Sequence, residues 1–192
     1  MMINKLKNYN QNAKIALVIR HADRELIPDG EIGNDILINE KGVKNSIELG
    51  QLLKQYKINK IFTSPISRCV QTSEFITNGY GKDIEIIKSN SLGDPGLHVS
   101  DEKEAGDFYL KFGFDEMYKR YKSNKKIPGV PMPIELKKLM TNFIERNTQK
   151  KGITIFVTHD SVIAFYDFAL NNKIYTKDNW INYLSGMILE IK

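Results

Sequence analysis

Five side chains with catalytic potential come at or just after short apolar runs of the kind that form buried strands. They are Arg20, His21, Arg68, His159 and Asp160. Two of the chain's three histidines fall directly after such a run, a coincidence that carries more weight than either motif alone. Because open α/β sheets bind ligands at the carboxyl ends of their strands, we expect these side chains to gather at one edge of a sheet.

This set of residue types suits the chemistry of a phosphate group. Arginine side chains make charge-assisted, often bidentate hydrogen bonds to phosphoryl oxygens, each worth roughly 1.5–3 kcal/mol net. A neutral imidazole among cations can attack phosphorus, because nearby positive charge lowers its pKa. A carboxylic acid can then protonate the leaving oxygen, an effect of roughly 10² to 10⁴ in rate. The residues therefore indicate phosphoryl transfer, with solvated strand ends and helix caps as the structural alternative.

The segments that must position these residues alternate between strands and helices. Short β-branched runs predict strands over residues 14–20, 58–63, 84–88 and 152–158. Helical spacing of apolar residues predicts helices over residues 40–56, from 64 onward, over 135–147 and over 161–170. Residues 180–191 predict two short strands about Ser185 and Gly186, closing the sheet edge. This alternation implies an α/β fold with a doubly wound, mainly parallel sheet and helices on both faces.

Local signals mark where two of the helices begin. Asn39 is expected to cap the helix that starts near residue 40. Ser64 followed by Pro65 predicts a cap and a first helical position, which puts Arg68 in the first turn. The predicted inner stripe of that helix is Ile66, Val70, Ser73 and Ile76.

Residues 89–135 differ in character from the rest of the chain. Glycine and proline punctuate this stretch, and between them lies an aromatic-rich helical segment over residues 108–121. We interpret the stretch as a cap insertion over the site. An insertion that merely covers one face of the sheet is the alternative.

Length and composition limit the class of protein. The 192 residues fit one domain, 1–192, whose Asn-rich first 13 residues we expect to be flexible. The net charge of +5 comes mostly from lysines scattered among acidic residues, so we expect no nucleic-acid partner. The single cysteine, Cys69, excludes an intrachain disulfide and a multi-thiolate metal site. No apolar run suits a signal peptide or a membrane span, so we expect a cytoplasmic protein without a membrane partner.

Four stretches resemble motifs of the histidine phosphatase superfamily, which has the phosphoglycerate mutase-like fold. Arg20-His21 resembles the family's Arg-His-Gly motif, and residues 34–42 (NDILINEKG) are similar to its D-x-x-L-T-x-x-G stretch. Residues 157–163 (VTHDSVI) resemble the strand that carries the second histidine. The most specific match is residues 62–76 (FTSPISRCVQTSEFI), similar to the SSPLxRAxQTAE helix. The four matches occur in the family's order and span most of the chain.

The resemblance implies a covalent phosphohistidine mechanism without a metal or an organic cofactor. His21 would be the nucleophile, and Arg20, Arg68 and His159 would hold the phosphoryl group. The sequence departs from the pattern at Ala22, which stands at the place of the motif's glycine. A single added methyl group need not abolish activity.

Two features resemble instead the acid phosphatase and phytase branch of the superfamily. Arg24 completes an Arg-His-x-x-Arg pattern and would also bind phosphate, and Asp160 follows the second histidine, as that branch's proton donor does. The chain lacks the length of that branch's helical domain, and its size resembles the mutase and small-phosphatase branch. There the acid is a glutamate in Leu-x-Glu, and Asp94 occupies the corresponding place. Both aspartates are therefore candidates for the general acid, with Asp160 slightly favoured; helix capping and turn formation are their structural alternatives.

We therefore expect a phosphatase that hydrolyses a phosphate monoester or anhydride of a small molecule. The open alternatives are a phosphoglycerate-mutase-like phosphotransferase, a protein phosphohistidine phosphatase, and a module that binds a phosphorylated ligand without turnover. The sequence specifies neither the substrate nor the oligomeric state.

Overall fold

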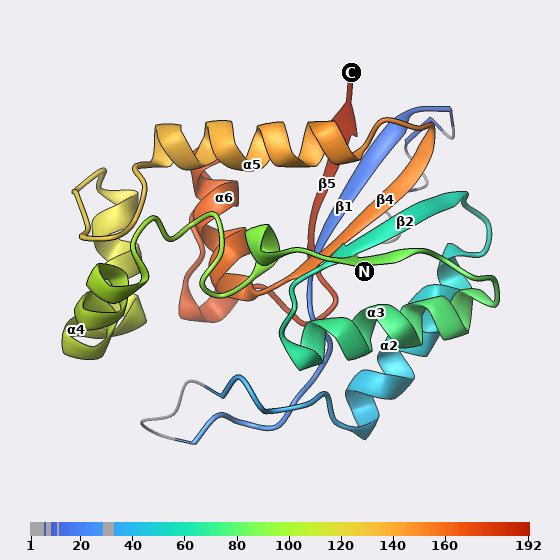
Figure 1. Cartoon of the computed structure of the whole chain (residues 1–192), viewed down its shortest axis with the longest axis horizontal. Coiled ribbons are helices and arrows are strands. Elements are labelled where there is room, and N and C mark those ends of the chain that lie inside the picture. The colour runs from blue at the N-terminus through green and yellow to red at the C-terminus, as the bar shows by residue number, and fades with distance from the viewer. Residues whose placement is uncertain (1–5, 7–8, 11, 29–32) are drawn as a thin grey trace.

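A five-stranded sheet in the order β3-β2-β4-β1-β5 forms the centre of the computed structural model, which describes residues 6, 9–10, 12–28 and 33–192 (Figure 1). The strands are β1 (Lys14–Arg20), β2 (Ile58–Thr63), β3 (Ile86–Lys88), β4 (Gly152–Thr158) and β5 (Gly186–Ile191). The first four run parallel, and β5 pairs antiparallel with β1 at the sheet edge. The predicted flexible stretch, residues 1–13, lies mostly outside the described residues.

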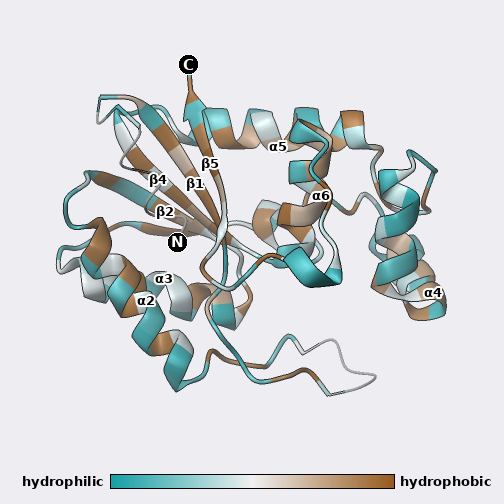
Figure 2. Ribbon diagram, turned by 180° about the vertical axis from the view of Figure 1, so that it is seen from behind, coloured by the Kyte–Doolittle hydropathy of each residue, from teal (hydrophilic) through white to brown (hydrophobic). Residues whose placement is uncertain are grey.

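Helices cover both faces of this sheet, as the sequence predicts (Figure 1). On one face Ile15, Leu17 and Ile19 of β1 pack in a core with α2 (Glu40–Leu53) and α3 (Ser67–Tyr80). On the other face Ala16 and Val18 pack in a core with α5 (Pro133–Asn147) and α6 (Asp160–Asn171). Alternate residues of one strand thus enter two cores, and the central strands are apolar along their length (Figure 2). The fold is a doubly wound α/β sheet.

The register of the central strands decides which residues meet at the carboxyl edge. Arg20 pairs with Thr158, and Thr63 pairs with Val157. The backbone N–H of His21 donates to the Thr158 carbonyl oxygen at 2.9 Å. Because β1, β2 and β4 end level with one another, the residues that follow each of them lie side by side.

The N-cap prediction for α2 is confirmed, and the prediction for the start of α3 is wrong. The Asn39 side chain accepts a hydrogen bond from the Gly42 N–H at 3.0 Å. Helix α3 begins at Ser67, with Ile66 as an N-cap that makes no side-chain hydrogen bond. The Ser64 hydroxyl is instead 2.9 Å from Nε2 of His159, a contact between distant parts of the chain that local sequence does not reveal.

The inner face of α3 is also displaced from the predicted stripe. Ser73 and Ile76 are buried as predicted, whereas Ile66 and Val70 are only partly buried. The buried residues of the helix are Arg68, Cys69, Thr72, Ser73, Ile76 and Gly79. Arg68 is drawn to the inside of the fold because both histidines lie there.

The prediction of two short strands over residues 180–191 is half right. Only Gly186–Ile191 forms a strand, and residues 180–185 form an irregular segment around Arg20. The Ile181 carbonyl oxygen accepts from Nη1 of Arg20 at 2.7 Å, and Leu184 turns the chain with a φ of 53°. These contacts replace the pairing that a second strand would need.

The cap stretch contains a short 3₁₀ turn, η1 (Asn90–Leu92), and helix α4 (Glu102–Lys122), which lies beyond α6 at one end of the molecule (Figure 1). Gly113, with a φ of 74°, breaks the regular geometry of α4. Some of its aromatic side chains, such as Tyr118 and Tyr121, belong to the larger core, while Tyr109 and Phe112 are exposed. No described helix is long and apolar enough to cross a bilayer.

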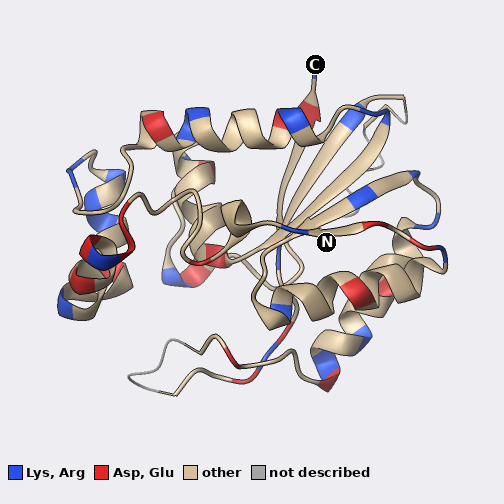
Figure 3. Cartoon of the chain, in the orientation of Figure 1, with Lys and Arg blue, Asp and Glu red and all other residues tan. Residues whose placement is uncertain are grey.

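Lysine, arginine, aspartate and glutamate alternate along the outer helices (Figure 3). Basic and acidic side chains occur together on α2, α4 and α5. The cations that stand apart from this pattern are those at the carboxyl edge of the sheet.

Candidate functional site

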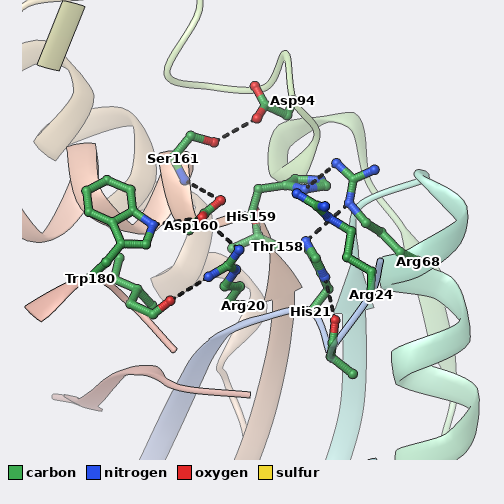
Figure 4. Close-up of polar contacts among 12 residues, drawn as sticks. Arg20, His21, Arg24, Arg68, Asp94, Thr158, His159, Asp160, Ser161 and Trp180 are labelled. Carbon is green, nitrogen blue, oxygen red and sulfur yellow. Dashed lines mark hydrogen bonds and ion pairs between the residues drawn. The ribbon is translucent and has the colours of Figure 1, made fainter. Parts of the chain in front are cut away.

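The two histidines meet at the carboxyl edge of the sheet, as the sequence predicts. His21 follows β1 and His159 follows β4, and their ring centroids lie 5.6 Å apart at an interplanar angle of 64°. Each residue is only 1% exposed. Arg68 comes from the first turn of α3 and lies against both rings (Figure 4). The fold therefore brings three separate segments into one polar cluster.

The hydrogen bonds of His21 identify which ring nitrogen is available for chemistry. Its Nδ1 lies 2.8 Å from the Ala22 carbonyl oxygen, and because that oxygen can only accept, Nδ1 carries the hydrogen. Nε2 therefore holds a lone pair, which accepts from Nε of Arg68 at 3.2 Å. Burial lowers the pKa of His21 well below its ordinary 6.5, and the charges of His159, Arg68 and Arg20 act in the same direction. His21 is thus a neutral imidazole with a free Nε2.

The loop that carries His21 is fixed to the neighbouring helices by its backbone. Ala22 is fully buried, and its N–H donates to Oγ1 of Thr72 at 3.0 Å. The Asp23 carbonyl oxygen accepts from the Asn39 N–H at 3.0 Å and lies against Gly42. The methyl group of Ala22 is therefore accommodated inside a rigid turn.

Arg68 connects the two histidines. Its Nη2 donates to Nδ1 of His159 at 3.2 Å, and Nη1 donates to the Gly33 carbonyl oxygen at 2.8 Å. Since arginine only donates, Nδ1 of His159 accepts, and Nε2 carries the hydrogen that reaches Ser64. The pKa of His159 falls to about 4, because burial and the charge of Arg68 outweigh the attraction of Asp94. Both imidazoles are therefore neutral near pH 7.

Arg20 is held from several sides. Its Nη2 forms an ion pair with Oδ2 of Asp160 at 2.9 Å, and its guanidinium carbon lies 4.0 Å from the centroid of the Tyr183 ring. The indole Nε1 of Trp180 donates to the same Asp160 oxygen at 2.8 Å (Figure 4). Asp160, the first residue of α6, therefore lies in the site with its carboxylate bound to Arg20.

The second candidate acid, Asp94, approaches from the cap stretch. Its Oδ2 accepts from the Ser161 hydroxyl at 2.7 Å, and its Oδ1 lies 3.2 Å from Nε2 of His98. Burial raises the pKa of Asp94, but hydrogen bonds from His98 and Ser161 and the charges of His98 and His159 lower it further, so the net shift is downward. Neighbouring residues of α6 thus contact each aspartate.

Backbone contacts hold the Asp94 turn against the sheet. The Thr158 hydroxyl donates to the Leu92 carbonyl oxygen at 2.7 Å. Both the histidine and the cap turn are therefore anchored at the end of β4.

Arg24 lies on the loop after His21, near Arg68 (Figure 4). Its Nη1 donates to the Glu25 carbonyl oxygen at 2.6 Å. Burial and the charge of Arg24 both lower the pKa of Arg68. All seven residues predicted for the site are therefore found in one region, although their roles remain predictions.

Sequence reasoning missed the residues that hold the predicted ones in place. Trp180 and Tyr183 fall in the segment predicted as strand, and Ser161 carries no motif of its own. The single tryptophan was the one compositional signal available, but nothing in the sequence places it beside Asp160. In the part of the chain that the structure describes, no group of three or more His, Cys, Asp or Glu is arranged to hold a metal ion.

The arrangement can hold a tetrahedral anion. Three arginines supply N–H donors, and two neutral histidines lie beside them within a mostly buried cluster. The free Nε2 of His21 provides a nucleophile, and two carboxylates lie within the same region. These are the parts that phosphoryl transfer requires.

Comparisons with known proteins agree with this geometry. Residues 16–172 match the family model of the histidine phosphatase superfamily (branch 1). The 2,3-bisphosphoglycerate-dependent phosphoglycerate mutase of Thermoplasma acidophilum is 25% identical over 156 residues, which cover 78% of this chain and 72% of that protein.

Solved structures show the same fold. The phosphoglycerate mutase of Bacillus anthracis str. Sterne superposes with a TM-score of 0.60 at 16% identity, covering 93% of this chain and 88% of that one. A mycobacterial glucosyl-3-phosphoglycerate phosphatase superposes with a TM-score of 0.55 at 14% identity, covering 84% and 81%. At these identities the likeness shows a shared fold, and the activities in those names are those of the relatives.

Proposed function

The chain belongs to branch 1 of the histidine phosphatase superfamily, a superfamily of phosphatases and mutases, and on that premise we propose that it is a phosphatase. The substrate is a phosphate monoester or anhydride of a small molecule, and the reaction passes through a phosphohistidine on His21. The observation that carries this proposal is the tautomer of His21. Its Nδ1–H is bound to the Ala22 carbonyl oxygen, so the Nε2 lone pair is fixed toward the arginines.

In the first step Nε2 of His21 attacks phosphorus, and the bond from phosphorus to the leaving oxygen breaks. The charge on the phosphoryl oxygens is met by Arg20, Arg24 and Arg68, with a hydrogen bond from His159. Arg68 must turn away from Nε2 of His21, because its own N–H occupies that lone pair before substrate binds. In the second step water attacks phosphorus, the bond to Nε2 breaks, and phosphate is released.

We assign the proton transfers to Asp94 rather than Asp160. Oδ2 of Asp160 accepts from both Arg20 and Trp180, so protonating that carboxylate would disrupt an ion pair. Asp94 accepts from the Ser161 hydroxyl, and a hydroxyl can accept a hydrogen bond as readily as it donates one. Asp94 can therefore change protonation state without losing this partner.

The low pKa of Asp94 in the free protein fits this assignment once substrate is considered. A phosphate anion that enters beside Asp94 raises the pKa of the carboxyl by like-charge repulsion. Asp94 then gives its proton to the leaving oxygen, and as a carboxylate it takes a proton from the attacking water in the second step. The proton count balances over one turnover.

The test is release of phosphate from an activated aryl phosphate across acid to neutral pH in the presence of EDTA. We compare the wild type with His21→Ala, and use Tyr166→Phe, which changes a side chain far from the two histidines, as a control. Turnover should vanish in His21→Ala and persist in the control. Turnover in His21→Ala at the wild-type rate would overturn the covalent role of His21.

A mutase is the second candidate, because the relative from Thermoplasma acidophilum carries that name. Incubation of the wild type with 3-phosphoglycerate separates the two activities. A phosphatase releases inorganic phosphate, whereas a mutase accumulates 2-phosphoglycerate without that release. Transfer without release would replace the proposed activity by the mutase.

A further inference from the structure

Residues 180–183 enclose the Arg20 side chain, and we propose that Trp180 and Asp160 are positioning residues that fix its guanidinium for phosphate. We call residues 180–183 together with Asp160 the Arg20 clamp. Through Trp180 the clamp also links Arg20 to helix α4 of the cap. The inference rests on the proposed phosphoryl-transfer function and assigns residues that the resemblance to the family does not.

The clamp uses three kinds of contact on one side chain. The Ile181 carbonyl oxygen accepts from Nη1 at 2.7 Å, the Asp160 carboxylate pairs with Nη2 at 2.9 Å, and the Tyr183 ring stacks at 4.0 Å. Arg20 is only 9% exposed. An arginine has five N–H donors, so after these two hydrogen bonds three remain for a phosphoryl group. The clamp thus selects the direction from which Arg20 can donate.

Trp180 in turn fixes Asp160. Its indole N–H donates to Oδ2 of Asp160 at 2.8 Å, while the Ser161 backbone N–H lies 3.2 Å from Oδ1. The carboxylate therefore accepts from Arg20 and Trp180 through one oxygen. Without the indole donor, only Arg20 and the first turn of α6 would hold it.

The other side of Trp180 packs against the cap. Its ring meets Phe114 edge to face at 5.5 Å and Tyr118 at 5.9 Å, both from α4. Phe114 directly follows Gly113, where the helix departs from regular geometry. A continuous set of contacts therefore runs from α4 through Trp180 and Asp160 to Arg20, and the position of the cap bears on the arginine.

Two substitutions remove separate contacts of the clamp. Trp180→Phe keeps a ring against Phe114 and removes the N–H donor, whereas Asp160→Asn keeps an acceptor for the indole and removes the charge that pairs with Arg20. The matched control is Tyr175→Phe, which also contacts Trp180 but loses only a hydroxyl bound to Asp167. All three lose one buried polar contact, so a general loss of stability would affect the control as well.

The first readout is the dissociation constant of inorganic phosphate, measured by calorimetry, which needs no turnover. We expect it to rise about tenfold in Trp180→Phe and in Asp160→Asn, and to stay within twofold in Tyr175→Phe. Trp180 is the only tryptophan, so its fluorescence in the wild type should also change as phosphate binds.

The second readout is the split between KM and kcat for an aryl phosphate. An arginine out of position loses ground-state and transition-state binding alike, so KM should rise about tenfold with kcat within threefold. A structural defect would lower the active fraction, and hence kcat, and leave KM unchanged. That second pattern, or wild-type phosphate affinity in both variants, would overturn the clamp.

The outcomes separate this inference from the proposed function. Weakened phosphate binding in both variants of a protein that shows no turnover would support the clamp and refute the phosphatase. Normal turnover with unaltered phosphate binding in both variants would do the reverse. If one variant fails to fold, the other still decides, because the two act on different bonds.

Discussion

His159 should make the free energy of unfolding depend on pH between 7.5 and 5. In the folded chain its ring is 1% exposed and its pKa is about 4, against an ordinary 6.5. The unfolded chain therefore binds a proton in this interval that the folded chain does not, and stability falls as the pH falls. Integrated between the two pKa values, the contribution of His159 lost on going from pH 7.5 to 5 is about 2 kcal/mol.

The assay compares the wild type with His159→Gln. The amide of glutamine offers a donor for Ser64 and an acceptor for Arg68 but does not titrate. His21 changes stability in the same direction, since its pKa is also lowered, so only the difference between the two proteins isolates His159. Urea unfolding at several pH values, followed by the fluorescence of Trp180, gives both curves.

The wild type should lose about 2 kcal/mol more than His159→Gln over this interval. Carboxyl groups contribute little, because the ordinary pKa of an aspartate is 3.8, below the interval. Parallel curves for the two proteins would show that burial does not keep His159 neutral. The argument that the site holds neutral imidazoles ready for attack would then be wrong.

Three further outcomes follow from named contacts. Asp94→Asn should slow hydrolysis of alkyl phosphates by about 10² or more while sparing activated aryl phosphates, and Asp160→Asn should show no such asymmetry; equal behaviour of the two in leaving-group series would refute our choice of acid. Gly42→Ala should destabilise the fold by about 2 kcal/mol, because a Cβ there would lie 2.2 Å from a backbone oxygen, whereas Gly106→Ala, in open space within α4, should stabilise it by about 1 kcal/mol; thermal unfolding measures both. Burial raises the pKa of Cys69 to about 12, so the native thiol should resist a thiol reagent at pH 8 and react fully in urea; rapid labelling of the folded protein would contradict that.

The sequence made the sheet edge predictable because local patterns carry that information. The apolar runs before His21 and His159 are buried strands, and parallel strands must end at the same edge. Asn39 caps α2 because its own side chain reaches a backbone N–H three residues on. Such contacts lie within a few residues of one another, so the sequence pattern is sufficient to predict them.

The start of α3 and the course of residues 180–185 were not predictable in this way. Ser64 appears to the sequence as a helix cap, yet its hydroxyl lies beside His159, 95 positions away. Residues 180–185 have strand-like composition, yet Ile181 uses its carbonyl oxygen for Arg20. In both cases a buried partner from a distant part of the chain competes successfully with the local preference.

The sequence by itself determined that two histidines and an arginine would meet at the carboxyl edge of a parallel sheet, because strand order and direction are encoded in short apolar runs. Only the tertiary structure decided which partner each candidate acid takes. Asp160 pairs with Arg20 and Trp180, and Asp94 with Ser161 and His98. Most of these bonds join segments far apart in sequence, and their lengths depend on how helices and loops pack, so no periodicity or motif in the chain specifies them.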